Sequence, residues 1–276
     1  MTARKPSAIS HAVRAHFTSA QEKNLVVARS NLLVLYTISE QGLVQIEEMD
    51  VYGTIIDIVV ISKPDTRAGV RRPDQLLLIK ESSRRTLSLL TFKSNRIVVS
   101  SHVILPKPLV SITACLCRYH VGSQVVGLHH SHGLIQFFKL DRNASLQNAA
   151  KQNERLLEEP NVVDFQFFFS PQHKAAGLCV AILHVDHVGR VFVTSHPVKD
   201  LGHVISHIPI NHEATMLIPV PQPVGGFAIA GGAAISYVDP VDPHRSKIRP
   251  VPFFAATAAT VLSPRTFLVG GEGEIG

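Results

Sequence analysis

The sequence has no tryptophan, few cysteines and few charged residues. Its 276 residues include three cysteines, Cys115, Cys117 and Cys179, and charged residues make up 17%. An odd, low cysteine count argues against a disulfide framework and favours a reducing compartment. No run of about 18 apolar residues is present, and the first ten residues have no apolar core. We therefore expect neither a membrane span nor a secretory signal.

Short apolar runs, separated by polar or glycine-containing breaks, fill most of the chain. The runs at 24–28, 32–38 and 54–61 are rich in β-branched and aliphatic residues. Nearly twenty such runs follow one another at a spacing of about 8–12 residues, which is typical of an all-β protein. So many strands exceed one ordinary sandwich and predict an incomplete β-propeller of about four to five four-stranded antiparallel blades. Without tryptophan there is no WD repeat, so we expect degenerate blades.

One polar segment, at 141–159, interrupts this pattern. It is compatible with a short helix or with a surface loop between sheets.

A glycine pattern near the end of the sequence has the spacing of a dinucleotide fingerprint. It reads Gly271-x-Gly273-x-x-Gly276. We predict neither a helix nor a βαβ unit around it, so a hairpin turn that uses the positive φ of glycine accounts for it better. The sequence therefore predicts no nucleotide cofactor.

Cys115-x-Cys117 with His120 is the most metal-like cluster. Residues two apart in a strand share a face, so both thiols could point the same way. A structural zinc site needs four ligands, and no second pair with suitable spacing completes this one. We expect buried structural cysteines and no metal ion.

The remaining acidic residues and histidines form no recognised catalytic pattern. Asp57 and Asp164 each stand among strand aliphatics. We expect buried, hydrogen-bonded carboxyls that tie one blade to another. Several other residues are interpreted as polar turn residues: His129, His130, His132, His184, Asp186 and His187. The sequence thus predicts that the protein is not an enzyme.

An ordered set of motifs begins near the amino terminus. In order, these are Lys5-Pro6, HFTSA at 16–20, NLVVAR at 24–29, an aliphatic strand ending at Tyr36, Glu40-x-Gly42-Leu43 and Met49-x-Val51-Tyr52-Gly53. This order resembles the N-terminal propeller of the damage-specific DNA-binding protein large-subunit family, the adaptors of cullin-RING ubiquitin ligases. Weaker matches continue downstream, whereas the loops at 67–74 and 239–252 depart from the family pattern. The superfamily also includes the large subunit of the cleavage-polyadenylation specificity factor and a splicing factor 3b subunit, which stay as alternatives.

The resemblance implies that residues 1–276 form an N-terminal β-propeller domain truncated at its C-terminal end. It implies a non-enzymatic, nuclear scaffold for DNA damage repair, with the cytoplasm as a second location. Its expected partners are WD-repeat substrate receptors, and a cullin-RING ligase through regions absent from this sequence. Receptor contact is expected at the final turn: Gly270, Gly271, Glu272, Gly273 and Glu274.

The chain is moderately basic, with a net charge of +6. The arginines at 67, 71, 72, 84 and 85 fall in predicted loops, and no basic run alternates with aromatic residues. Solvated loop charge is the favoured interpretation, so we expect contact with nucleic acid to be indirect or weak. A propeller that binds nucleic acid directly stays as a further alternative.

Overall fold

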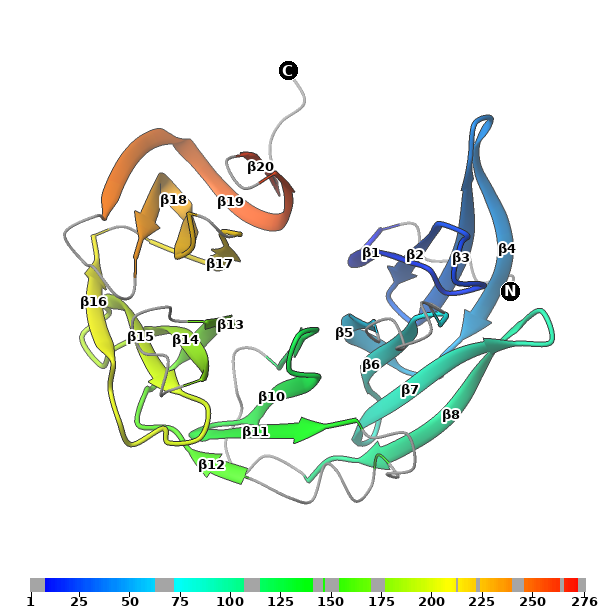
Figure 1. Cartoon of the computed structure of the whole chain (residues 1–276), viewed down its shortest axis with the longest axis horizontal. Coiled ribbons are helices and arrows are strands. Elements are labelled where there is room, and N and C mark those ends of the chain that lie inside the picture. The colour runs from blue at the N-terminus through cyan, green and yellow to red at the C-terminus, as the bar shows by residue number, and fades with distance from the viewer. Residues whose placement is uncertain are drawn as a thin grey trace. The chain divides into compact units, whose positions relative to one another are not determined.

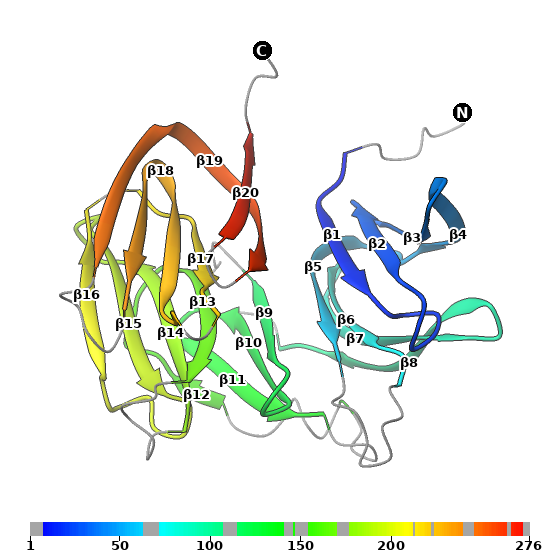
Figure 2. The ribbon, with the colours of Figure 1, turned by 45° about the horizontal axis from the view of Figure 1, so that its top comes forward.

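The computed structural model describes residues 8–62, 72–106, 115–140, 146, 154–169, 177–211, 213–221, 224–239, 246–263 and 266–272. These residues form twenty strands, which group in chain order into five four-stranded sheets. We call each sheet a blade. Within each blade, strands that are consecutive in the sequence are neighbours (Figures 1 and 2).

The blades have the following strands. Blade 1 contains β1 (His11–Ala15), β2 (Asn24–Arg29), β3 (Leu32–Ser39) and β4 (Gly42–Asp50). Blade 2 contains β5 (Thr54–Ile61), β6 (Gln75–Glu81), β7 (Arg85–Lys93) and β8 (Arg96–Ile104). Blade 3 contains β9 (Leu116–His120), β10 (Val125–Ser131), β11 (Leu134–Lys139) and β12 (Glu154–Leu156). Blade 4 contains β13 (Val162–Phe169), β14 (Leu178–Val185), β15 (Val191–Pro197) and β16 (Ser206–Ile210). Blade 5 contains β17 (Met216–Pro219), β18 (Phe227–Val238), β19 (Lys247–Ser263) and β20 (Thr266–Glu272).

The predicted fold class, an all-β chain of four-stranded antiparallel blades, is confirmed. Five blades is the upper end of the expected number. The burial of β6, the second strand of blade 2, explains why its sequence is a continuous apolar run. Leu76, Leu77, Leu78 and Ile79 of β6 are all buried, although successive side chains point to opposite faces of a sheet. Both faces of this strand are therefore covered, as the sequence pattern of a doubly buried strand requires.

The chain divides into two compact units. The first unit contains blades 1 and 2, the second contains blades 4 and 5, and the strands of blade 3 are divided between them. In the first unit, one apolar core is shared by blades 1 and 2. Its largest fully buried members include Phe17 and Leu33 from the blade 1 part of the chain and Leu76 and Leu90 from blade 2. Phe17 packs against Phe92, with ring centroids 6.1 Å apart.

The second unit has a comparable core between blades 4 and 5. It joins Leu183 and Val193 of blade 4 to Leu217 and Phe227 of blade 5. Phe168 meets Phe227 edge to face, with ring centroids 5.3 Å apart. In both units, adjacent blades are thus held together by apolar side chains.

The structure corrects several expected strand boundaries. The runs at 226–230 and 233–238 form one strand, β18, whose register shifts between Gly232 and Ala234. Gly231 and Gly232 both have positive φ, so they allow this bend within a continuous strand. The sequence also predicts a strand at 110–116; β9 begins at Leu116, and residues 110–114 lie outside the described residues.

Three strands were absent from the expectations. These are β1, β12 and β19. The polar segment at 141–159 contains β12. The segment at 239–252, which departs from the family pattern, contains the start of β19 at Lys247. Pro250 of β19 pairs with Ala234 of β18, since the fixed φ of proline is compatible with an extended chain.

The start of β18 provides a test of close packing. Gly226 and Gly189 both have positive φ, at 75° and 87°. A Cβ on Gly226 would lie 2.6 Å from the carbonyl oxygen of Val238, whereas a Cβ on Gly189 would meet nothing within 4 Å. We expect Gly189→Ala to cost about 1–2 kcal/mol for the left-handed backbone, and Gly226→Ala about 1–3 kcal/mol more for the clash. Urea unfolding measures both, and equal losses would contradict the packing described for Gly226.

Candidate functional site

Asp57 links blade 2 to blade 3. It lies in β5 at a register shift between Ile55 and Asp57, and it is 8% exposed. Its Oδ1 accepts a hydrogen bond from the Ile58 N–H at 2.8 Å, and its Oδ2 accepts one from the Cys117 N–H at 2.8 Å. The Arg118 guanidinium lies 3.2 Å from the same Oδ2. Burial raises the pKa of the Asp57 carboxyl, and the charge of Arg118 opposes that effect.

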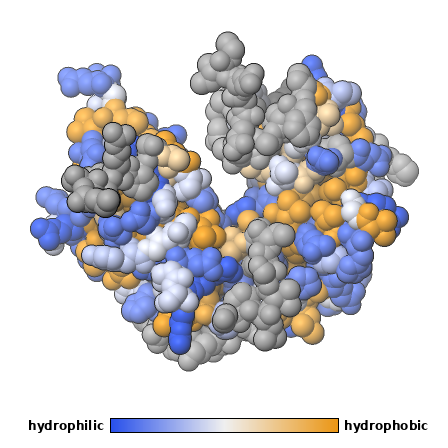
Figure 3. Space-filling view, turned by 180° about the vertical axis from the view of Figure 1, so that it is seen from behind, coloured by the Kyte–Doolittle hydropathy of each residue, from blue (hydrophilic) through white to orange (hydrophobic). Residues whose placement is uncertain are grey.

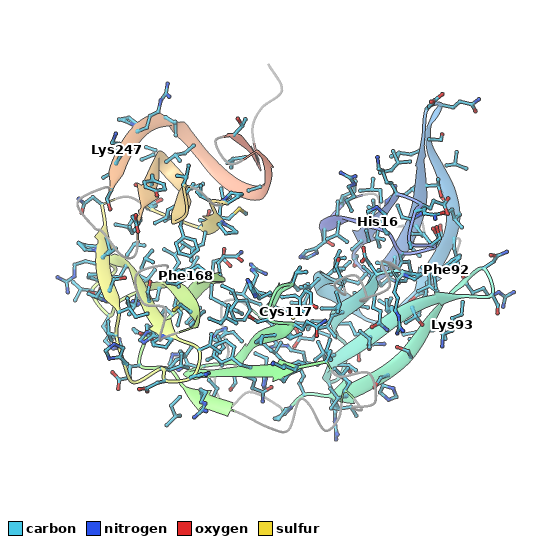
Figure 4. The ribbon with its side chains drawn as sticks, in the orientation of Figure 1. His16, Phe92, Lys93, Cys117, Phe168 and Lys247 are labelled. Atoms are coloured by element: carbon cyan, nitrogen blue, oxygen red, sulfur yellow. The ribbon has the colours of Figure 1, made fainter. Side chains whose placement is uncertain are left out.

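Two further contacts support the same junction. The Arg85 guanidinium donates to the carbonyl oxygen of His130 at 3.1 Å, and the Tyr119 hydroxyl donates to that of Ser62 at 2.9 Å. Figure 4 labels Cys117, whose backbone N–H donates to Asp57.

Asp164 makes the equivalent link between blades 4 and 5. It lies in β13 at a register shift between Val162 and Asp164 and is buried. Its Oδ1 accepts from the Phe165 N–H and its Oδ2 from the Leu217 N–H, each at 2.8 Å. Leu217 is the second residue of β17, as Cys117 is the second residue of β9. The predicted role of both aspartates, buried carboxyls that tie one blade to the next, is confirmed.

The three cysteines are buried, as expected for Cys115 and Cys117. Cys115, Cys117 and Cys179 are buried and form no disulfide. The Nδ1 of His120 accepts a hydrogen bond from the Ser123 N–H at 3.0 Å, and burial lowers the pKa of this imidazole. Across the described ranges, no group of three or more His, Cys, Asp or Glu side chains is placed to hold a metal ion.

Several histidines that we interpreted as turn residues lie inside strands instead. His129 and His130 are buried in β10, and His184 is buried in β14. Asp186 does lie in a turn, where its carboxylate accepts hydrogen bonds from the N–H groups of Val188 and Arg190.

His184 belongs to a polar cluster on one face of blade 4. Its Nε2 lies 2.9 Å from Thr194 Oγ1, which lies 2.8 Å from His207 Nδ1. The Phe192 ring stacks on His207, with centroids 4.4 Å apart. Burial lowers the pKa of His184, so its imidazole is neutral at neutral pH.

Glu159 and His196 form a buried pair that the sequence analysis missed. Glu159 Oε1 lies 2.7 Å from His196 Nε2, and both side chains are almost inaccessible. Burial alone would raise the pKa of Glu159, but the hydrogen bond and charge of His196 outweigh it and lower that pKa. Strand alternation was the available signal: Phe192, Thr194 and His196 are spaced two apart and therefore share a face.

The predicted contact segment at 270–274 is only partly described. Gly270, Gly271 and Glu272 continue β20, where they pair with Ala258, Ala256 and Ala255 of β19. The expected turn is therefore wrong for these three residues, because their backbone continues the pairing with β19. Gly273 and Glu274 lie outside the described residues.

The contacts above support a rigid frame, because each described carboxylate link joins first strands of adjacent blades.

Among the described residues, no helix is long and apolar enough to span a membrane.

Comparison with known protein families shows to which family the chain belongs. A family model described as the "RSE1/DDB1/CPSF1 first beta-propeller" matches residues 8–263. The chain belongs to this family. The suspected resemblance is thereby confirmed, and the five blades are blades of this first propeller.

Curated relatives of this first propeller carry the name DNA damage-binding protein 1. The chain is 27% identical to the Drosophila melanogaster protein over 267 residues, which is 93% of this chain and 22% of the relative. It is 29% identical to DNA damage-binding protein 1b of Arabidopsis thaliana over 250 residues, or 86% of this chain and 21% of the relative. The Caenorhabditis elegans protein is 22% identical over 242 residues, which is 86% of this chain and 20% of the relative. The chain thus spans about a fifth of the length of these relatives.

The aspartate links of the propeller predict two graded losses of stability. Asp164→Ala leaves the buried Leu217 N–H without its acceptor and should cost about 1–3 kcal/mol. Asp57→Ala also removes the partner of Arg118 and should cost about 3–5 kcal/mol. Denaturant unfolding measures both. Glu158→Ala, at an exposed position, is the control and should change the free energy of unfolding by less than about 0.5 kcal/mol. Losses at Asp57 and Asp164 no larger than the control's would show that the links do not hold the blades.

The Glu159–His196 pair predicts a pH dependence. The pKa of Glu159 is lower in the folded than in the unfolded state, so its stabilising effect is present above the unfolded value and lost on acidification. The free energy of unfolding of the wild type should therefore exceed that of Glu159→Gln by a margin that shrinks below about pH 4.5. Urea unfolding at a series of pH values measures this margin, and a margin that grows on acidification would contradict the pairing.

Proposed function

We propose that this protein is a non-enzymatic scaffold whose first propeller binds substrate-receptor proteins of cullin-RING ubiquitin ligases that act in DNA damage repair. The match of residues 8–263 to the family of first propellers carries this proposal. The relatives named DNA damage-binding protein 1, similar over most of the chain, support this branch of the family.

The geometry suits a scaffold. An adaptor must hold its contact surfaces at fixed positions while its partners vary, and a propeller does this with a rigid frame and variable loops. The Asp57 and Asp164 links, together with the apolar cores between adjacent blades, supply that rigidity.

The proposed partners are WD-repeat receptors, with the cullin bound by regions outside this sequence. The segment at 270–274 is the proposed receptor contact. We further propose a nuclear location, and contact with nucleic acid that is indirect or weak.

The second candidate is a scaffold for pre-mRNA cleavage and polyadenylation or splicing. It is favoured by the family description itself, which groups RSE1 and CPSF1 with DDB1. The two candidates differ in their partners and not in the chemistry of the blades.

Affinity purification of the tagged chain from its own cells separates the two. We expect WD-repeat receptors to be recovered with the wild type, because the cullin is proposed to bind regions outside this sequence. Glu272→Lys combined with Glu274→Lys reverses the charge of the proposed contact and should reduce receptor recovery about tenfold, or about 1.4 kcal/mol.

Glu158→Lys is the matched control, because it reverses an acidic side chain at an exposed position elsewhere, and it should leave recovery unchanged. Recovery of polyadenylation or splicing subunits in place of WD-repeat receptors would favour the second candidate. An equal loss with the control variant would remove the segment at 270–274 as the contact.

A further inference from the structure

The end of the hairpin formed by β3 and β4 exposes an unusual concentration of large apolar side chains. Leu43 and Val44 are 55% and 54% exposed, and Ile38 and Ile46 are also exposed. Figure 3 shows hydrophobic surface beneath the hydrophilic tip of this hairpin, at the upper left of that view. We call these four residues the hairpin patch. Isolated exposed apolar residues are common, but a contiguous group indicates an interaction site.

The hairpin patch occupies both faces of the strand pair. Ile38 pairs with Leu43, and Thr37 pairs with Val44, so Leu43 and Val44 point to opposite faces. Neither face is therefore covered at this end of the hairpin. A partner that covers both faces must lie along the edge of the strand.

That edge is available for pairing. β4 is the last strand in the order of blade 1, and among the described strands it pairs with β3. Every second residue of an antiparallel edge strand directs its N–H and C=O away from its neighbour. The strand β8 of blade 2 approaches β4 farther along, where the Ile97 N–H donates to Glu47 Oε2 at 2.6 Å. Residues 42–46 precede that contact.

The charge of the hairpin selects the partner. Residues 37–50 contain Glu40, Glu47, Glu48 and Asp50 and no lysine, arginine or histidine, in a chain whose net charge is +6. Asp50 accepts from the Asn31 side-chain amide and the Tyr52 N–H, which are uncharged donors that leave its charge in place. Two copies pairing through β4 would oppose acidic residues, which is unfavourable. A basic partner is complementary.

We propose that β4 is a docking edge for an extended segment of a partner protein in which apolar and basic residues alternate. The segment pairs with residues 42–46 as a fifth strand of blade 1. Alternate side chains of a strand share one face. The apolar side chains of the segment therefore cover Ile38 and Leu43 on one face, and its basic side chains lie on the opposite face, which carries Val44 and Glu47. This mode of recognition takes affinity from main-chain hydrogen bonds and specificity from alternate side chains. The docking edge shares no residue with 270–274, so either proposal can fail without the other.

Synthetic peptides test the docking edge with the full chain. The probe is a fluorescein-labelled peptide of about six residues that alternates valine and lysine, measured by fluorescence anisotropy. We expect binding that weakens with salt. The same peptide with glutamate for lysine should bind at least about tenfold more weakly, or about 1.4 kcal/mol. N-methylation of every second peptide nitrogen should abolish binding, because it removes the donors for strand pairing.

Variants localise the binding. Leu43→Thr with Val44→Thr places β-branched residues, which suit a strand, at both positions and should weaken binding about tenfold, or about 1.4 kcal/mol. Val98→Thr with Val99→Thr is the matched control, because both valines are exposed on the edge strand β8 of blade 2 (Figure 4 labels Lys93 at the tip of its hairpin). The control should bind as the wild type does.

Several results would overturn the proposal. These are no binding of the basic peptide, equal binding of the acidic or N-methylated peptide, and equal weakening by the β8 control. Self-association in sedimentation that is lost with Leu43→Thr and Val44→Thr would assign the edge to a second copy of the chain, and would overturn it as well.

Discussion

A buried carboxylate that accepts a backbone N–H from the next blade is the interaction on which this structure depends. Asp57 and Asp164 both lie at a register shift in the first strand of a blade, and each accepts from its own following residue and from the second residue of the next first strand. A charged acceptor makes a stronger hydrogen bond than a neutral one, and burial keeps water from competing for it. Apolar cores attract adjacent blades but are not directional, so these carboxylates fix which backbone positions meet.

The same arrangement explains how a propeller can form without tryptophan or a regular sequence repeat. What repeats is the place of the aspartate in the first strand of a blade and not a sequence motif. The residues around Asp57 and Asp164 differ, while the contacts of the two carboxylates are the same. Blade 4 adds a second kind of polar packing, in which Glu159, His196 and His184 occupy a buried face. Membership of the first-propeller family is consistent with a frame that keeps its contacts while its sequence and loops vary.

Much of this could be predicted from the sequence, for reasons that particular residues make plain. A carboxylate among strand aliphatics, as at Asp57, must find a partner, so its role followed from burial alone. Strand bounds failed where a bend or a proline interrupted the pattern, as at Gly232 and Pro250, because tertiary pairing overrides local preference there. His184 is polar and was therefore expected in a turn, and only the register of β14 reveals that Thr194 hydrogen-bonds to its Nε2. The expected turn at 270–272 is a strand for the same reason, since its pairing partner in β19 was not recognised.

The central claim is that these carboxylates hold the first strand of one blade to that of the next. Amide hydrogen exchange at Cys117 and Leu217 tests it most directly, because their N–H groups donate to Asp57 and Asp164. The account predicts that both amides exchange as slowly as those inside the strand ladders of the same blades. Exchange at the rate of an exposed turn, such as that at His187, would contradict it.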